Sequence, residues 1–193
     1  MMDQPPCPIL FSARLRIRPV LPVDHQGLFE MWHEAGAAET GGFDVPVTLE
    51  DIAGSVAYFK TLNESGFYYK WVIESLQGDE FLGDLELYPL KPQVRPWVEW
   101  GIGYCLKKSA RHMGYMKEAL ARVLDFAFND RLVWRIKADV LANNEVSIRL
   151  LEENGFRMEG VQIGKSVANG AASDMNLYGL TREMRRQSRH AIG

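Results

Sequence analysis

The alternation of apolar and polar residues divides the chain into short strands and helices. Strands are expected where apolar residues alternate or cluster between turn residues, and helices where they recur at every third or fourth position. The pattern predicts strands at residues 14–18, 67–75, 81–90, 97–106, 133–141, 156–163 and 175–180. It predicts helices at residues 22–34, 49–62, 113–128 and 144–153.

Turn and capping residues support these boundaries. Gly78 lies in the turn between the second and third strands, as expected for a hairpin. Thr48 and Asp51 have the spacing of a capping box before the second helix, and Gly155 follows the last helix as a left-handed stop. The element order βααβββαβαββ predicts a mixed α/β (α+β) fold, with helices packed on a largely antiparallel sheet.

The chain is expected to form one domain with a short appendage at each end. Residues 1–13 contain several prolines, which prevent regular pairing, and are interpreted as a flexible leader. Residues 14–181 hold all the periodic elements, with no internal repeat or low-complexity linker. Residues 182–193 are rich in arginine and are interpreted as a solvated tail.

Composition restricts the class of protein. Of the 193 residues, 47% are hydrophobic and 24% are charged, which is typical of a globular domain. The net charge of -3 provides no basic field, so nucleic acid is not expected as a partner. No secretory signal and no apolar run of ~20 residues is present, and the two cysteines form no disulfide framework. We therefore expect a cytoplasmic protein with no membrane association.

The fourth predicted strand continues through a basic loop into the most regular helix. Lys107, Lys108 and Arg111 supply positive charge, and Gly114 allows a ligand to approach the backbone closely. Free N–H groups and the positive end of the helix dipole would point toward the same place. The segment fits an anion such as a phosphate, but ordinary strand–loop–helix turns can have the same composition.

A second polar segment follows the next strand. Asn144 can cap the helix that begins there, and Ser147 shares a helix face with Leu150 and Leu151. The Ser147 hydroxyl could therefore point inward toward a ligand. Alternatively, it bonds back to its own chain inside a well-capped helix.

Together the two segments resemble the GNAT superfamily of N-acetyltransferases. Residues 111–116 match its [Arg/Gln]-x-x-Gly-x-[Gly/Ala] pyrophosphate loop, with Met116 in place of the small last residue. Residues 144–156 resemble its second motif, Asn-x-x-Ser-x-x-Leu-Leu-Glu-x-x-Gly-Phe. Residues 46–51 and 174–178 are similar to the RimJ/RimL-type branch, which acetylates the N-termini of ribosomal proteins.

The resemblance, which covers residues 14–181, implies a GNAT-like sheet flanked by helices on both faces, with one splayed strand. It implies direct acetyl transfer from acetyl-CoA to a primary amine such as a protein N-terminal α-amine. The oxyanion would lie near the Tyr104–Cys105 backbone amides. The residues implied to bind the cofactor are Tyr104, Cys105, Leu106, Arg111, His112, Met113, Gly114, Tyr115, Met116, Asn144 and Ser147. No metal is expected, because the four histidines have no metal-ligand spacing.

Glu99 and Ser147 are the candidate catalytic residues. Glu99 could accept the proton of the amine, although it also fits a surface or paired glutamate, and Glu86 is a second candidate. The resemblance implies that Ser147 protonates or holds the CoA thiolate, since Leu151 stands where many GNAT enzymes have a tyrosine. Cys105 is interpreted as a small buried thiol.

Two other functions and the oligomeric state are left open by the sequence. The acceptor could be a small amine such as a polyamine or an antibiotic, a choice that the loop at residues 41–47 would shape. The chain could also be a catalytically silent acyl-CoA-binding module, because Ser166 stands where ribosomal-type members have a glutamate. Trp97 and Trp100 could form the face of a homodimer.

Overall fold

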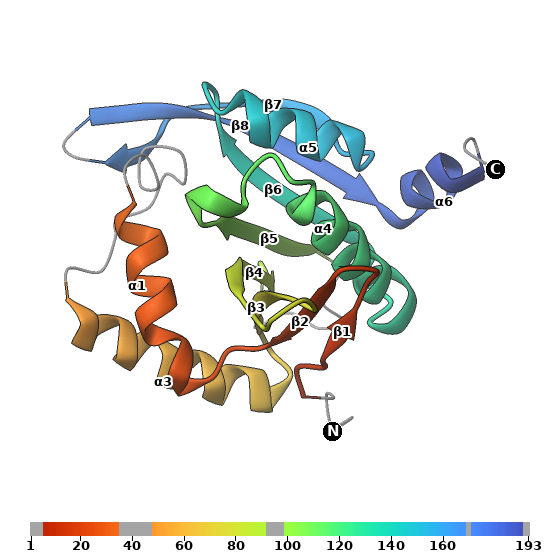
Figure 1. The fold of residues 1–193 in the computed structure, drawn as a ribbon. Helices are drawn as coiled ribbons and strands as arrows, with labels where there is room; N and C mark the ends of the chain where they lie inside the picture. The colour runs from red at the N-terminus through yellow and green to blue at the C-terminus, as the bar shows by residue number, and fades with distance from the viewer. Residues whose placement is uncertain (1–5, 35–47, 92–98, 169–170, 191–193) are drawn as a thin grey trace.

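The computed structural model describes residues 6–34, 48–91, 99–168 and 171–190, and its centre is one eight-stranded sheet (Figure 1). The strands are β1 (Leu10–Phe11), β2 (Leu15–Pro19), β3 (Tyr69–Ser75), β4 (Phe81–Pro89), β5 (Glu99–Leu106), β6 (Arg135–Leu141), β7 (Arg157–Ala168) and β8 (Ala171–Thr181). Their order in the sheet is β1-β2-β3-β4-β5-β6-β8-β7. Neighbours are antiparallel except β5 and β6, which run parallel. The predicted mixed, largely antiparallel sheet is confirmed.

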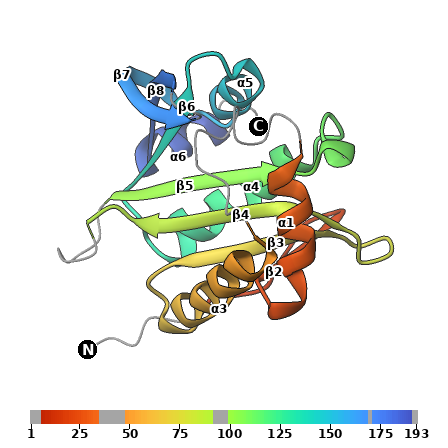
Figure 2. The ribbon, with the colours of Figure 1, turned by 90° about the vertical axis from the view of Figure 1, so that its left-hand side faces the viewer.

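Helices cover both faces of the sheet. They are α1 (His25–His33), α3 (Leu49–Ser65), α4 (Tyr115–Asp125), α5 (Glu145–Glu153) and α6 (Arg182–His190). In Figure 2, α1 and α3 lie in front of β3 and β4, and α4 lies behind them. Each predicted helix is present. The capping box of Thr48 and Asp51 starts α3, because each side chain accepts a hydrogen bond from the other residue's N–H.

An apolar cluster fills each side of the sheet. The larger cluster joins the sheet to α4 and α5, and its centre is a group of stacked and edge-on rings from Tyr69, Trp71, Trp100 and Phe126. Trp100 is only 2% exposed. It therefore belongs to this core, and the expectation that it forms a dimer face is wrong. Trp97, the other residue of that expectation, lies outside the described residues.

The segment before β2 is packed, in contrast to the expected flexible leader. Cys7 and Leu10 are buried, and the Cys7 N–H donates to the Asn63 carbonyl over 2.9 Å. The Trp71 indole N–H donates to the Pro8 carbonyl over 2.8 Å. Proline prevents regular strand pairing, but it does not prevent burial or the acceptance of a hydrogen bond. Residues 6–13 are therefore part of the domain.

The arginine-rich tail likewise forms structure where solvation was expected. Its helix α6 packs beside the end of α4, which continues as a π-helical turn at Phe126–Asp130. The Arg182 Nε–H donates to the Val133 carbonyl over 3.1 Å, and Arg185 pairs with Asp125 at 3.0 Å. Guanidinium groups thus satisfy carbonyl and carboxylate groups near a helix C-terminus, where positive charge is favoured.

Candidate active site

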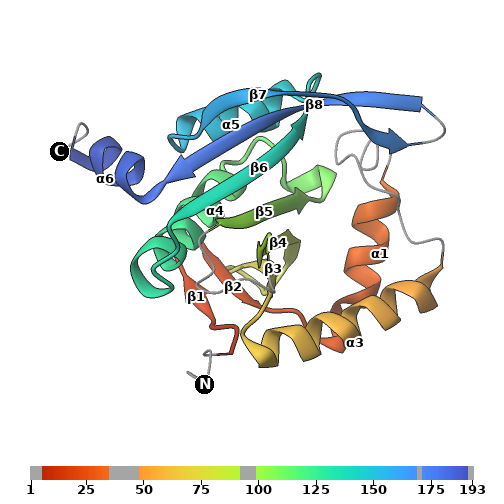
Figure 3. The ribbon, with the colours of Figure 1, turned by 180° about the vertical axis from the view of Figure 1, so that it is seen from behind.

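β5 and β6 separate soon after they begin to pair. Their register consists of three residue pairs that end at Gly101 and Lys137. Beyond this point β5 continues along β4, while β6 continues along β8, so the two strands diverge (Figure 3). The expected splayed strand is confirmed, and the divergence opens a gap within the sheet.

Alternate residues of β5 turn their main chain toward this gap. The Lys107 N–H donates to the Leu82 carbonyl over 3.0 Å, and the Leu90 N–H donates to the Glu99 carbonyl over 3.1 Å. Odd-numbered residues of β5 therefore face β4. In an antiparallel ladder the intervening residues face the opposite edge. In the splayed part of β5 these are Ile102, Tyr104 and Leu106.

The geometry departs from the sequence-based expectation at Cys105. Its main chain belongs to the ladder with β4, opposite Asp84, so its amide does not face the gap. The Tyr104 main chain does face the gap. The Leu106 carbonyl already accepts a hydrogen bond from Arg111 Nε over 3.1 Å. Tyr104 and Cys105 were both expected to direct their amides toward the oxyanion. Only the Tyr104 amide faces the gap.

The basic loop ends at Gly114, which is the N-cap of α4. Gly114 has φ +76°, and a Cβ built there would meet only the Arg14 Nη2 atom, at 3.5 Å. His112 in the same loop also has a positive φ, of 62°. Non-glycine residues in this conformation are uncommon and gather at functional sites. The loop thus presents the open N-terminus of α4, whose first N–H groups have no partner within the helix.

Arg14 supports this loop through contacts that the sequence pattern does not predict. Its Nε atom pairs with Glu118 at 2.7 Å, and its Nη1 atom donates to the Met113 carbonyl over 3.1 Å. The guanidinium also lies over the Tyr115 ring, 4.7 Å from its centroid. Arg14 and the loop are about a hundred residues apart in sequence, so no local pattern could reveal this contact.

Acidic side chains already contact much of the positive charge of the loop. Lys107 pairs with Glu80 at 2.8 Å. Glu34, at the end of α1, accepts a hydrogen bond from the Lys108 N–H, and its carboxylate lies 3.8 Å from Arg111. The loop is therefore less basic than its sequence indicates. Its capacity for anions depends more on the main chain and on the dipole of α4.

Ser147 lies in the first turn of α5 and meets β5 across the gap. Its N–H donates to the Asn144 side chain over 3.1 Å, which confirms Asn144 as the cap of this helix. Its hydroxyl lies 2.7 Å from the Tyr104 hydroxyl. Burial raises the pKa of Tyr104 to about 12, although the hydrogen bond with Ser147 opposes the shift. The first turn of α5 and the splayed part of β5 therefore adjoin one gap.

Glu99 does not lie near Tyr104 and Ser147. It lies at the paired end of β5, where its carboxylate contacts Arg135 Nε at 3.0 Å. Arg135 also bonds to Glu159. At ~3.3 Å per residue, Glu99 is roughly 17 Å along the strand from Tyr104. The structure thus gives Glu99 a partner and separates it from Ser147.

Glu86 lies much nearer to the gap. It pairs with Gly103 in the sheet, and a Cβ built on Gly103 would lie 2.7 Å from the Glu86 Oε1 atom. Burial alone would raise the pKa of Glu86, but the charge of Lys70 and hydrogen bonds from Tyr68 and Lys70 lower it overall. Lys70 also contacts Asp84 at 3.0 Å, whose pKa is raised by burial. Glu86 is therefore ionised beside the strand residue that precedes Tyr104.

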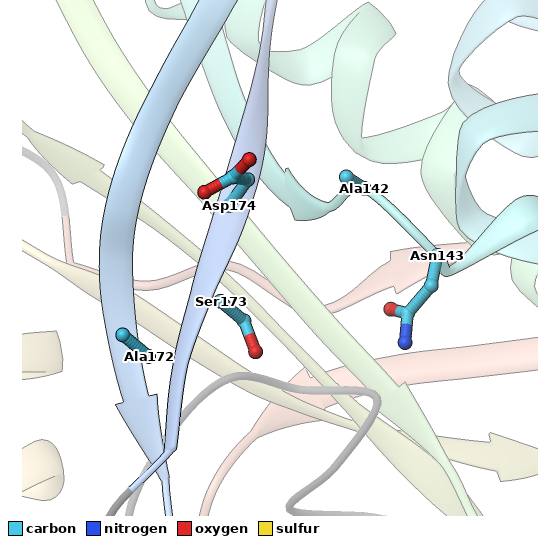
Figure 4. Close-up of a pocket in the computed structure, with 5 residues that line it drawn as sticks. All are labelled: Ala142, Asn143, Ala172, Ser173 and Asp174. Carbon is cyan, nitrogen blue, oxygen red and sulfur yellow. The ribbon is translucent and has the colours of Figure 1, made fainter.

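A pocket of about 360 Å³ lies between the end of β6 and the start of β8, next to Asn144. It is lined by Ala142, Asn143, Ala172, Ser173 and Asp174 (Figure 4). Asp174 accepts a hydrogen bond from the Gly164 N–H over 2.8 Å, which fixes the irregular part of β7. The loop at residues 41–47, which was expected to shape the choice of acceptor, lies outside the described residues.

Two further findings concern the part of the chain that the structure describes. None of its helices is both long enough and apolar enough to cross a membrane. It contains no group of three or more His, Cys, Asp or Glu side chains that could hold a metal ion.

A sheet that splays beside two helix N-termini, with a glycine-containing loop before one of them, defines the acyl-CoA-dependent acetyltransferase architecture. Residues 14–157 match the sequence model of the acetyltransferase (GNAT) domain. The chain belongs to this family and is an N-acetyltransferase.

Relatives and solved structures agree with this assignment. The uncharacterized N-acetyltransferase YoaA of Bacillus subtilis is 26% identical over 175 residues, which cover 91% of this chain and 97% of YoaA. The ribosomal L7/L12 α-N-protein acetyltransferase RimL, in complex with coenzyme A, has a TM-score of 0.78 at 20% identity, covering 90% of this chain and 98% of RimL. Spermidine N-acetyltransferase of Vibrio cholerae, in complex with CoA and spermine, has a TM-score of 0.78 at 15% identity, covering 91% and 99%. These two structures share the fold.

Proposed function

We propose that this chain transfers an acetyl group directly from acetyl-CoA to a primary amine, and that the acceptor is a protein N-terminal α-amine. The observation that carries the proposal is the gap between β5 and β6, onto which the Tyr104 main chain and Ser147 both open. Acetyl-CoA supplies an activated thioester. The chain has to hold it, position an amine against it and stabilise the charges that develop.

The cofactor-binding residues have distinct tasks in this proposal. The main chains of Tyr104 and Leu106 offer an edge along which the pantetheine arm can pair as an added strand. The loop at residues 111–116 and the N-terminus of α4 receive the pyrophosphate, because anions are stabilised at helix N-termini. Asn144 fixes the first turn of α5, and Ser147 donates a hydrogen bond to the departing sulfur.

Glu86 is the carboxylate best placed to serve the amine. Its side chain lies over Gly103, where the absence of a side chain makes room for the Glu86 carboxylate beside the splayed part of β5. Because its pKa is lowered, Glu86 stays ionised and attracts the ammonium form of the acceptor. It then passes the released proton to water. Glu99, held by Arg135, is left to a structural role.

The charges on this face of the sheet favour an acceptor with one positive charge. Every carboxylate identified on it contacts a lysine or an arginine. Asp84 and Glu86 share Lys70, Glu99 and Glu159 share Arg135, and Asp139 pairs with Lys137. Two carboxylates on one lysine leave one net negative charge beside Gly103, which suits the single ammonium group of an N-terminal α-amine, whereas a polyamine carries several. Both cysteines are free, which fits a reducing cytoplasm.

The test is an acetylation assay with three matched acceptors, read by mass spectrometry. They are a peptide with a free N-terminus, the same peptide blocked at the N-terminus but containing lysine, and spermine. We expect a single acetyl group on the free N-terminus. Acetylation of spermine alone would assign the chain to small amines. Tight acetyl-CoA binding without transfer to any amine would make it a silent acyl-CoA-binding module.

A further inference from the structure

Two hydroxyl groups meet across the gap, and the proposed transfer uses only one of them. The Tyr104 side chain extends from β5 toward α5, against the core, and its hydroxyl lies 2.7 Å from Ser147 Oγ. Within the described part of the chain, Ser147 is the hydrogen-bond partner of this phenol. At the position where many members of the family have a tyrosine on α5, this chain has Leu151, which is fully buried.

The protonation state of Tyr104 and the acceptors within its reach determine which hydroxyl donates the hydrogen bond. With a pKa of about 12, Tyr104 stays protonated at neutral pH and has one hydrogen to give. A polar hydrogen at a partly buried site is costly to leave without an acceptor, and Ser147 Oγ is the acceptor in reach. A phenol is also a better donor than an aliphatic hydroxyl. Tyr104 therefore donates to Ser147, and the hydrogen of Ser147 must point elsewhere.

The direction of this bond matters because a serine hydroxyl has competing options. In a first helical turn it readily donates back to a main-chain carbonyl, which would leave no donor for a ligand. The Ser147 hydroxyl contacts Tyr104, and within the described residues it donates to no main-chain carbonyl. The remaining direction is the gap itself.

We propose that Tyr104 is a positioning residue for acetyl transfer: by donating its O–H to Ser147 Oγ, it aims the Ser147 O–H at the thioester sulfur. The inference rests on the proposed function. In the transfer, the amine nitrogen bonds to the acetyl carbon, the C–S bond breaks, and the sulfur leaves with the electron pair as a thiolate. Ser147 stabilises that thiolate by a hydrogen bond. The amine proton passes by way of Glu86 to water, and the thiolate is later protonated by solvent.

Tyr104 does not deliver its proton to the departing sulfur. An ordinary thiol has a pKa near 8.5, so proton transfer from a phenol of pKa about 12 would be unfavourable by roughly three orders of magnitude. The pair acts by hydrogen bonding alone, and it strengthens as charge develops on the sulfur.

A double-mutant cycle of Tyr104→Phe and Ser147→Ala tests the coupling. Tyr104→Phe should lower kcat about tenfold with little change in the KM for acetyl-CoA, because Ser147 keeps its hydroxyl but loses its orientation. In the Ser147→Ala background, Tyr104→Phe should cause no further loss. Equal losses in both backgrounds would overturn the proposal and leave Tyr104 a structural residue, as would full activity of Tyr104→Phe beside an impaired Ser147→Ala.

The matched control is Tyr178→Phe. Tyr178 lies on β8, is 2% exposed, and donates to Glu152 of α5 over 3.0 Å. The Tyr178→Phe variant therefore loses the same chemical group as Tyr104→Phe. It also loses a hydrogen bond to the same helix, but not one to Ser147. We expect its activity to match that of the wild type, with thermal unfolding measured for both variants. A loss equal to that of Tyr104→Phe would trace the effect to the stability of α5.

A second measurement needs no acceptor. The pH dependence of CoA binding reports the pKa of the bound thiol, which a hydrogen bond to the thiolate lowers. We expect this pKa to be depressed on the wild-type protein and to rise toward its ordinary value with Tyr104→Phe, but not with Tyr178→Phe. An unchanged value with Tyr104→Phe would overturn the inference even if the acceptor class is wrong. Absence of acetyl transfer by the wild-type protein would instead refute the proposed function.

Discussion

Replacing Gly114 by aspartate tests whether acetyl-CoA binds at the loop between β5 and α4. The substitution places a side chain in the left-handed region, at φ +76°, which costs ~1–2 kcal/mol of stability. The new Cβ has room, since only Arg14 Nη2 lies within 4 Å. Its carboxylate would stand at the N-terminus of α4, where the pyrophosphate is proposed to lie.

The expected effect on binding is much larger than the strain. A carboxylate about 4 Å from a phosphate charge costs roughly 4 kcal/mol at an effective dielectric constant of 20, which weakens binding about a thousandfold. Acetyl-CoA at ~100 times its Kd adds about 2.7 kcal/mol to the wild-type stability, or roughly 5–11 °C in Tm for a chain of this size. At the same concentration the Gly114→Asp variant would be at ~0.1 Kd and would gain about 0.1 kcal/mol.

Thermal unfolding with and without acetyl-CoA measures both effects, and Gly78→Asp is the control. Gly78 has φ +92° in the β3–β4 turn, and a Cβ there meets nothing within 4 Å. That variant should lose similar stability and keep the full shift on addition of acetyl-CoA. A full shift in Gly114→Asp, or its loss in Gly78→Asp, would refute the placement of the cofactor.

Three further outcomes are expected. Ser147→Ala should lower kcat by ~10–100-fold while the Kd of acetyl-CoA stays the same, since the contact strengthens only as the thiolate forms; equal turnover would return Ser147 to a structural role. Glu86→Gln should lower kcat/KM by ~10²–10⁴-fold, and Glu99→Gln should leave it near the wild-type value; the reverse result would assign the proton transfer to Glu99. Cys105 is half-buried, and desolvation raises the pKa of its thiol from 9.0 to about 12, so at pH 8 it should react with a thiol reagent about a thousandfold more slowly than the unfolded chain. Because the thiol ionises at a lower pH in the unfolded chain than in the folded protein, its contribution to stability should fall as pH rises from about 9 to 12. Rapid labelling of the folded protein would contradict the burial.

The elements with a strong local pattern were predictable from the sequence. The apolar stripe of α4, the capping box at Thr48 and the glycine of the β3–β4 turn each depend on neighbouring residues. The burial of Leu10 and the hydrogen bonds of Arg182 depend instead on residues far along the chain. Prolines and clustered arginines therefore suggested a loose leader and a solvated tail where the structure has packed segments.

In the candidate site too, the features with a local sequence signature were predictable and those that depend on distant residues were not. The loop around Gly114 and the cap at Asn144 carry local signatures, and the structure places them as expected. The roles of Glu99 and Tyr104 depend on where β5 leaves β6, because that point decides which end of β5 is open. Alternation along a strand indicates its two faces, but not the length over which a neighbour pairs with it.

The order of the strands has a consequence for how the chain is made. β8 lies between β6 and β7 in the sheet, although it is the last of the eight described strands along the chain. β6 therefore emerges from the ribosome with only a short pairing to β5, and waits for roughly 40 more residues, or ~2–8 s at ordinary rates of synthesis, before its other edge can be covered. During that interval β6 is an open strand edge in a crowded cell, and such edges pair readily with other chains. A ribosome that stalls before residue 171 would leave a nascent chain with the loop at residues 111–116 already made but with β6 still exposed.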